Sequence, residues 1–130
     1  MNNTFLGKSE HNLYYILCYT SNCAIIWSRT PGDPYMTFEW DENKNQRNIK
    51  LHKIRFETAA KVFNDPFRIE RFDTSHSDDE DRYIAIGEIN GSTFIVFVSY
   101  TERKEVIRLI SARKATASER REYYDSKERN

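Results

Sequence analysis

The most constraining feature of the sequence is the run of apolar residues from Phe94 to Val98, set inside the segment 93–100. A short run rich in β-branched and aromatic side chains predicts a central strand that is covered on both faces. Asn90-Gly91 stands just before it, and this dipeptide favours a tight hairpin because both of its residues tolerate positive φ. The sequence therefore predicts an antiparallel sheet built around this strand.

Three further strands are predicted close to this one in the sequence. The segments 67–72 and 82–89 precede it, and a stretch beginning at Val106 follows it after a turn at 101–104. Short connections between consecutive strands favour an antiparallel meander.

Helices are predicted before and after the strands. Asp41 is a good N-cap for a helix over 42–51. Phe56, Ala59, Ala60 and Phe63 have the spacing of one apolar helix face. Thr116 and Glu119 form a capping box that begins a third helix. The predicted fold class is α+β: two N-terminal helices, a four-stranded antiparallel meander and a C-terminal helix, with the helices on one face of the sheet.

The first 35 residues differ in composition from the rest of the chain. They carry little charge, contain both cysteines (Cys18 and Cys23) and end in the breaker cluster Pro31-Gly32-Asp33-Pro34. We expect residues 1–35 to be an appendage, either poorly ordered or preceding a true start at Met36. The alternative is an extra strand or helix between residues 14 and 27. The domain itself is predicted to span 36–124, followed by a charged tail at 125–130.

The same segment bears on where the protein works. Two cysteines without metal-ligand spacing favour neither a zinc site nor a disulfide scaffold, so we expect a reducing, cytoplasmic environment. The apolar stretch 13–27 is short and interrupted by polar residues, which argues against a membrane span or a signal peptide. No Gly-rich phosphate loop is present, and no cofactor is predicted.

Charge is balanced overall but unevenly distributed. The chain has 20 Lys and Arg against 20 Asp and Glu, so net charge does not indicate a nucleic-acid partner. However, the segment 73–81 has five acidic residues and no Lys or Arg, and the segment 102–121 has seven Lys or Arg against three Glu. A basic end on a neutral protein predicts local binding of a polyanion.

The candidate site residues are cations near the ends of the predicted strands. We expect the end of the fourth strand and the start of the second to converge, so that Arg82, Arg103 and Arg113 grip one phosphate and stabilise a phosphodiester transition state. The predicted substrate contacts are Arg108, Ser111 and Lys114.

Proton transfer is assigned to His52 and Tyr123, of which the tyrosine needs a lowered pKa to act as a base. This set suits metal-independent RNA cleavage, because the 2′-hydroxyl supplies the nucleophile within the substrate. Each residue also has a structural interpretation: Arg108 as a packing or ion-pair residue, Arg82 as a surface partner of Asp81, and His52 as a helix cap.

Many motifs of the segment 38–123 match one family in a single order. They are Phe38-Glu39-Trp40-Asp41 with Lys44, Asn48 and His52; Phe56-Glu57, Ala59-Ala60 and Val62-Phe63 before Asp65; Arg82 to Gly87; Thr101-Glu102-Arg103; and Arg108 to Thr116 with Glu119 and Tyr123. The chain resembles the BrnT family of type II toxins. The resemblance implies a RelE-like ribonuclease that arrests growth, held inactive by BrnA, a ribbon-helix-helix antitoxin through which the pair binds its operator DNA.

Two positions depart from the family pattern, and both concern helix ends. Lys53 stands where a glycine is usual, so the residue must accept a left-handed conformation or the first helix must end differently. Arg55 stands where a capping Ser or Thr is common, which removes an N-cap from the second helix.

Two other function classes stay open at this point. The chain can be a non-catalytic module that docks a partner and assists repression. It can also be a metal-dependent nuclease that uses the acidic run 78–81, since carboxylates bind hard cations.

Overall fold

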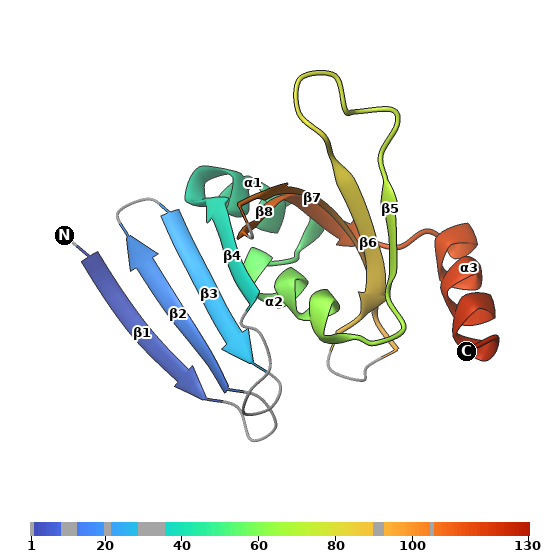
Figure 1. Ribbon diagram of the computed structural model, residues 1–130, viewed down its shortest axis with the longest axis horizontal. Helices are drawn as coiled ribbons and strands as arrows, with labels where there is room; N and C mark the ends of the chain where they lie inside the picture. Colours follow the sequence, from blue (N-terminus) through green and yellow to red (C-terminus); the bar gives the residue numbers. More distant parts are fainter. Residues whose placement is uncertain (1, 9–12, 20–21, 29–35, 90–92, 105) are drawn as a thin grey trace.

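The structure, a computed structural model, describes residues 2–8, 13–19, 22–28, 36–89, 93–104 and 106–130. The strands are β1 (Asn2–Lys8), β2 (Leu13–Tyr19), β3 (Asn22–Ser28), β4 (Met36–Asp41), β5 (Ile69–Phe72), β6 (Tyr83–Glu88), β7 (Ile95–Arg103) and β8 (Val106–Lys114). The helices are α1 (Glu42–His52), α2 (Phe56–Ala59), the 3₁₀ helix η1 (Ala60–Asn64) and α3 (Ala117–Glu128). The strands form one sheet in the order β1-β2-β3-β4-β8-β7-β6-β5 (Figure 1).

The predicted meander is confirmed as β5 to β8, which pair antiparallel in sequence order. The prediction of a four-stranded, purely antiparallel sheet is wrong, because β4 pairs with β8 in parallel through Thr37–Glu39 and Val106–Arg108. Local patterns predict hairpins, whereas a parallel pair joins segments far apart in the sequence. The local pattern before Asp41 therefore predicts only a helix cap.

The strands β1, β2 and β3 extend the sheet beyond β4 by successive antiparallel pairing. A strand between residues 14 and 27 was the alternative interpretation of this segment. The description of residues 1–35 as an appendage stays a prediction. The breaker cluster at 31–34 and the hairpin dipeptide at 90–91 lie outside the described residues.

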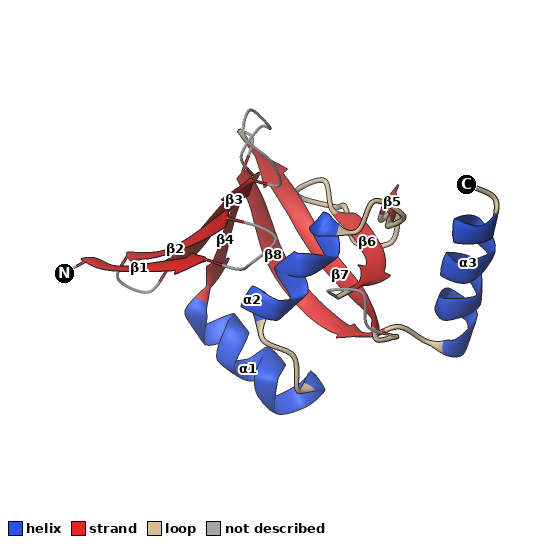
Figure 2. Cartoon of the chain, turned by 90° about the horizontal axis from the view of Figure 1, so that it is seen from below, coloured by secondary structure: helices blue, strands red, loops and turns tan. Residues whose placement is uncertain are grey.

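The helices do not share one face of the sheet, which corrects the predicted arrangement. Phe56 of α2 and Phe63 of η1 belong to a core with Leu109 of β8. Tyr123 of α3 belongs to a second core with Ile86 of β6. Because successive residues of β6 point to opposite sides and are buried on both, that strand needs cover on each face. Figure 2 shows α1 and α2 well separated from α3.

Two buried asparagines of α1 connect the helices to the sheet. The Asn48 side chain donates to the carbonyls of Ile54 and Ala112 and accepts from the Ala112 amide, so it fixes α1 to β8. The Asn45 side chain accepts from the Phe56 amide at 2.9 Å. Arg55 makes no side-chain cap, as predicted, and Asn45 satisfies the start of α2 in its place.

The ends of α1 and α3 follow the sequence closely. Asp41 accepts from the Asn43 amide, and Thr116 and Glu119 form the predicted capping box. α3 continues to Glu128, past residue 124, where the domain was predicted to end. Lys53 adopts φ 61°, the left-handed conformation that a glycine favours.

Replacing Lys53 by glycine is therefore expected to stabilise the protein. The left-handed conformation costs an L-residue roughly 1–2 kcal/mol more than it costs glycine. The flexibility that glycine adds to the unfolded chain offsets about 0.4–1 kcal/mol of this gain. We expect the free energy of unfolding in urea to rise by about 0.5–1 kcal/mol. Lys50→Gly, in the last turn of the same helix, is the control and should lower it by about 1 kcal/mol.

Candidate active site

The side chains of β7 and β8 alternate between an apolar and a polar side. Tyr100 and Leu109 pair across the two strands within the core that α2 covers. The neighbouring pairs point the other way: Thr101 with Arg108, Ser99 with Ser111, and Phe97 with Arg113. We call this second side the polar face, comprising Ser99, Thr101, Arg103, Arg108, Ser111 and Arg113.

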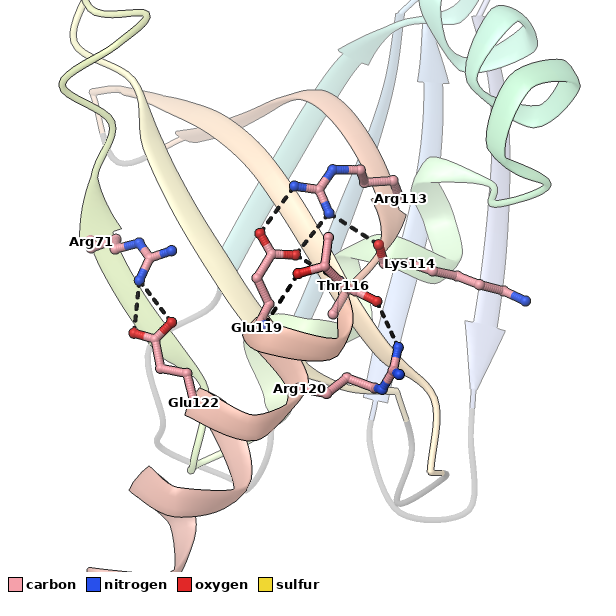
Figure 3. Close-up of polar contacts among 8 residues, drawn as sticks. Arg71, Arg113, Lys114, Thr116, Glu119, Arg120 and Glu122 are labelled. Atoms are coloured by element: carbon pink, nitrogen blue, oxygen red, sulfur yellow. Dashed lines mark hydrogen bonds and ion pairs between the residues drawn. The ribbon is translucent and has the colours of Figure 1, made fainter.

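Arg113 is fixed at one end of the polar face. Its guanidinium donates to both carboxylate oxygens of Glu119, at 2.8 and 3.1 Å, and to the carbonyl of Lys114 (Figure 3). It also lies over the Phe97 ring, 3.9 Å from the centroid. The Glu119 carboxylate completes the capping box of α3, and the hydrogen bonds from Arg113 hold its pKa below the usual range. Arg113 thus connects the end of β8 to the start of α3.

Arg103 and Arg108 lie at the other end of the polar face. Arg103 forms a two-pronged pair with Glu80, in which both nitrogen–oxygen distances are 2.7 Å. This contact lowers the pKa of Glu80. Arg108 pairs with Glu39 of β4 at 3.4 Å. Each arginine of the polar face is therefore accompanied by a carboxylate, an arrangement that fits the expectation of ion pairing at Arg108.

The predicted convergence of three arginines on one phosphate is wrong for this structure. Arg103 pairs with Val106 at the start of β8, whereas Arg113 pairs with Phe97, six positions back along β7. At 3.3 Å per residue the two ends are about 20 Å apart. In a meander, the end of the fourth strand lies beside the start of the third, not beside the start of the second.

The other predicted residues divide between the two ends and the two sides of the sheet. Arg82 precedes β6 at the Arg103 end, and its backbone closes the 73–82 loop by accepting from the Asp73 amide. Lys114 follows Arg113 but points to the opposite side, with its ammonium 5.1 Å from the Phe94 ring centroid. His52 is the exposed last residue of α1, which packs on the apolar side of β8. The structure does not bring His52 to the polar face.

Tyr123 is completely buried, and its surroundings oppose proton transfer. Its hydroxyl donates to Asp65 Oδ2 at 2.6 Å. Burial, together with the hydrogen bond to Asp65 and its charge, raises the pKa of Tyr123. A tyrosine base needs the opposite shift. The structure supports the interpretation that Tyr123 attaches α3 to the domain.

A Tyr123→Phe variant is expected to lose stability and retain its function. Removing one donor from a buried carboxylate costs about 1.5–3 kcal/mol. Urea denaturation should show this loss, while RNA cleavage per folded molecule should stay within about twofold of wild type. A drop in cleavage without a drop in stability would indicate that Tyr123 takes part in the reaction.

Sequence reasoning missed the carboxylates that accompany the arginines. Glu39, Glu80 and Glu119 come from β4, from the 73–82 loop and from α3, and no sequence signal paired any of them with an arginine. Sequence reasoning also missed Thr101, whose hydroxyl is buried and, among the described residues, makes no hydrogen bond of good geometry. Cross-strand register, which determines these neighbours, cannot be read from spacing alone.

Within the described residues, no group of three or more His, Cys, Asp or Glu side chains is arranged to hold a metal ion. A search of the same residues for a helix of sufficient length and apolarity to cross a bilayer finds none.

A family model for the ribonuclease toxin BrnT of type II toxin-antitoxin systems matches residues 40–119 of the 130-residue chain. The chain belongs to the BrnT family. The match covers the two ends of the polar face and the helices behind it. This confirms the resemblance drawn from the sequence motifs. A search of curated proteins finds no match.

Proposed function

We propose that this BrnT family member is an endoribonuclease toxin that cleaves RNA without a metal ion, arrests growth and is neutralised by a BrnA-like ribbon-helix-helix antitoxin. The observation that carries the proposal is the match to a family of ribonuclease toxins across both ends of the polar face. That face supplies cationic and hydroxyl groups, the chemistry needed to hold a phosphodiester.

The arginines serve as two contacts on an RNA strand. Arg103 and Arg108 bind at one end of β7 and β8, and Arg113 binds at the other. A separation of about 20 Å suits phosphates several nucleotides apart. Ser111, which lies between the two ends and directly opposite the buried Ser99, presents its hydroxyl group to the strand. One of the two ends then bears the scissile phosphate and stabilises its transition-state charge.

Proton transfer is proposed for only one of the two residues that the sequence suggested. Tyr123 acts structurally. His52 remains a candidate from the family resemblance, and it requires an RNA that wraps from the polar face to the end of α1. A His52→Gln variant that retains full cleavage eliminates this assignment.

The antitoxin is proposed to act by covering the polar face. Carboxylates already accompany Arg103, Arg108 and Arg113, so an acidic partner segment can exchange with them. An antitoxin that binds DNA then brings the complex to its operator, and the toxin needs no DNA contact of its own.

RNA cleavage in the presence of EDTA tests the proposal directly. Purified protein, freed from its antitoxin, is expected to cut a structured RNA with or without the chelator. It should leave 2′,3′-cyclic phosphate or 3′-phosphate ends, since the 2′-hydroxyl is the nucleophile. Cleavage that stops in EDTA and returns with Mg²⁺ would identify a metal-dependent nuclease.

A second candidate function is a non-catalytic module that docks the antitoxin and assists repression. The observation in its favour is that every arginine of the polar face is already paired with a carboxylate of the same chain. Such a module would show no cleavage under either condition, yet would still change the affinity of the antitoxin for its operator.

A further inference from the structure

The loop between β5 and β6 carries a carboxylate onto the polar face. Figure 1 shows this loop, residues 73–82, projecting beyond the ends of the strands. Its base is closed by the Asp73 amide, which donates to the Arg82 carbonyl, and by the Ser77 hydroxyl, which donates to the Asp73 carbonyl. From the closed loop, Glu80 reaches Arg103 of β7.

The contact between Glu80 and Arg103 has the geometry by which a guanidinium binds a phosphate. Two nitrogens, Nε and one Nη, donate to the two carboxylate oxygens, each at 2.7 Å. An arginine presents the same fork to two oxygens of a phosphate group. The Glu80 carboxylate therefore occupies the position that a phosphodiester would take.

Thr101 provides the second, independent observation. Its hydroxyl is buried, the residue being 2% exposed, and among the described residues none meets it in a hydrogen bond of good geometry. It lies two residues from Arg103 on the same side of β7 and directly opposite Arg108. The hydroxyl lies close enough to the Glu80 carboxylate to help lower its pKa. A buried donor left unpaired is unfavourable unless a ligand or a rearrangement satisfies it.

We propose that Arg103, Thr101 and Arg108 form an anion site for an RNA phosphodiester, and that Glu80 closes this site in the free protein as a displaceable latch. This inference rests on the proposed function, because it assumes that RNA is the ligand. An incoming phosphate takes the fork of Arg103 from Glu80, and the Thr101 hydroxyl donates to it. The 73–82 loop then moves away from the end of β7.

Glu80 is suited to this role because its carboxylate has no structural duty of the kind that Glu119 has. Glu119 accepts from a helix-capping amide as well as from Arg113, so its removal would damage α3. In the described part of the chain, the Glu80 carboxylate accepts from Arg103 and lies beside the Thr101 hydroxyl. Removing the Glu80 charge therefore opens the site without removing a helix cap.

Binding of a 2′-O-methyl RNA oligonucleotide, which cannot be cleaved through its 2′-hydroxyl, tests the latch. Fluorescence anisotropy is expected to show about two- to fivefold tighter binding for Glu80→Gln than for wild type, the value of an exposed ion pair. Glu122→Gln is the matched control, because Glu122 forms a similarly exposed pair at the edge strand β5, in which one nitrogen of Arg71 donates to both carboxylate oxygens. An equal gain in oligonucleotide affinity in both variants, or no gain in Glu80→Gln, would overturn the latch.

Thr101→Val, which removes the hydroxyl with little change in volume, tests the second part of the site. In the Glu80→Gln background it should weaken oligonucleotide binding by about two- to tenfold, and in the wild-type background by less. The melting temperature of the single variant should not fall, because the lost hydroxyl is unpaired. Unchanged binding in the Glu80→Gln background would remove Thr101 from the site.

Titration with sulfate separates this inference from the proposed function. In ¹⁵N-resolved spectra, the Arg103 Nε–H signal of Glu80→Gln should shift with sulfate, while that of wild type should respond more weakly. A sulfate response without RNA cleavage by any variant retains the latch and rejects the ribonuclease. Cleavage that is insensitive to EDTA and unchanged in Glu80→Gln, without any response to sulfate, would retain the ribonuclease and reject the latch.

Discussion

An Asp65→Ala variant is expected to lose about 3–5 kcal/mol of unfolding free energy, the largest stability loss that we expect from the protein. The Asp65 carboxylate is buried and accepts from the amides of Phe67 and Glu88 and from the hydroxyl of Tyr123. Its removal leaves three donors without a partner, each at a cost of about 1–3 kcal/mol. The effect is large because a domain of this size is stabilised by only about 5–15 kcal/mol.

This carboxylate connects three parts of the fold that are distant in sequence. Asp65 is the C-cap of η1, Glu88 ends β6, and Tyr123 belongs to α3. Gly87 leaves room for the contact, since a Cβ there would lie 3.1 Å from Asp65 Oδ2. We therefore expect the variant to loosen α3 first, with faster hydrogen exchange at 117–128 than at β7.

Urea denaturation followed by tryptophan fluorescence measures the loss. Asp73→Ala is the control, because Asp73 accepts from the Ser75 amide and contacts His76 within an exposed loop, and it should cost less than about 1 kcal/mol. Combining Asp65→Ala with Tyr123→Phe should cost less than the sum of the two single changes, since both remove the same hydrogen bond. A loss below about 1.5 kcal/mol for Asp65→Ala would show that water or neighbouring groups satisfy the three donors.

The sequence predicted those parts of the fold that depend on neighbours along the chain. The cap at Asp41, the capping box at Thr116 and the central position of β7 are all local or compositional signals. The left-handed conformation of Lys53 could also be expected from the sequence, because the helix ends there and the family usually has a glycine at this position.

Long-range pairing was not visible in the same way. The parallel contact between β4 and β8 and the contact of Tyr123 with Asp65 join segments more than fifty residues apart. The local sequence pattern of a segment does not indicate which distant segment it contacts. Of the candidate site, the sequence therefore proposed the arginines, whose role stays a prediction, while their carboxylate partners and their separation required the structure.

An Arg113→Ala variant is expected to reduce RNA cleavage by about 10²–10³-fold if Arg113 stabilises the scissile phosphate, the effect of losing one transition-state donor. If the scissile phosphate lies instead at the Arg103 end, Arg113 only binds a more distant phosphate of the RNA. The loss of cleavage should then be nearer tenfold and appear as a higher KM. Cleavage by Arg103→Ala must then show the larger effect. The two variants together locate the reaction on the polar face.

Stability has to be separated from activity in this comparison, because Arg113 also holds Glu119 at the start of α3. Arg71→Ala is the matched control, since it removes an arginine that pairs with Glu122 of the same helix but lies on the edge strand β5 (Figure 3). It should leave cleavage within about twofold of wild type. Equal losses in Arg71→Ala and Arg113→Ala would mean that disturbing α3, not losing a phosphate contact, reduces activity.

The pH dependence of stability gives an independent check on the same residue. Arg113 lowers the pKa of Glu119 in the folded state, so the pair contributes stability above the unfolded pKa of about 4.3, and this contribution is lost as pH falls through the folded value. Wild type and Arg113→Ala should therefore differ in unfolding free energy at pH 7 and converge under acid conditions. A difference that stays constant with pH would assign the stabilisation to the packing of Arg113 on Phe97, which does not titrate.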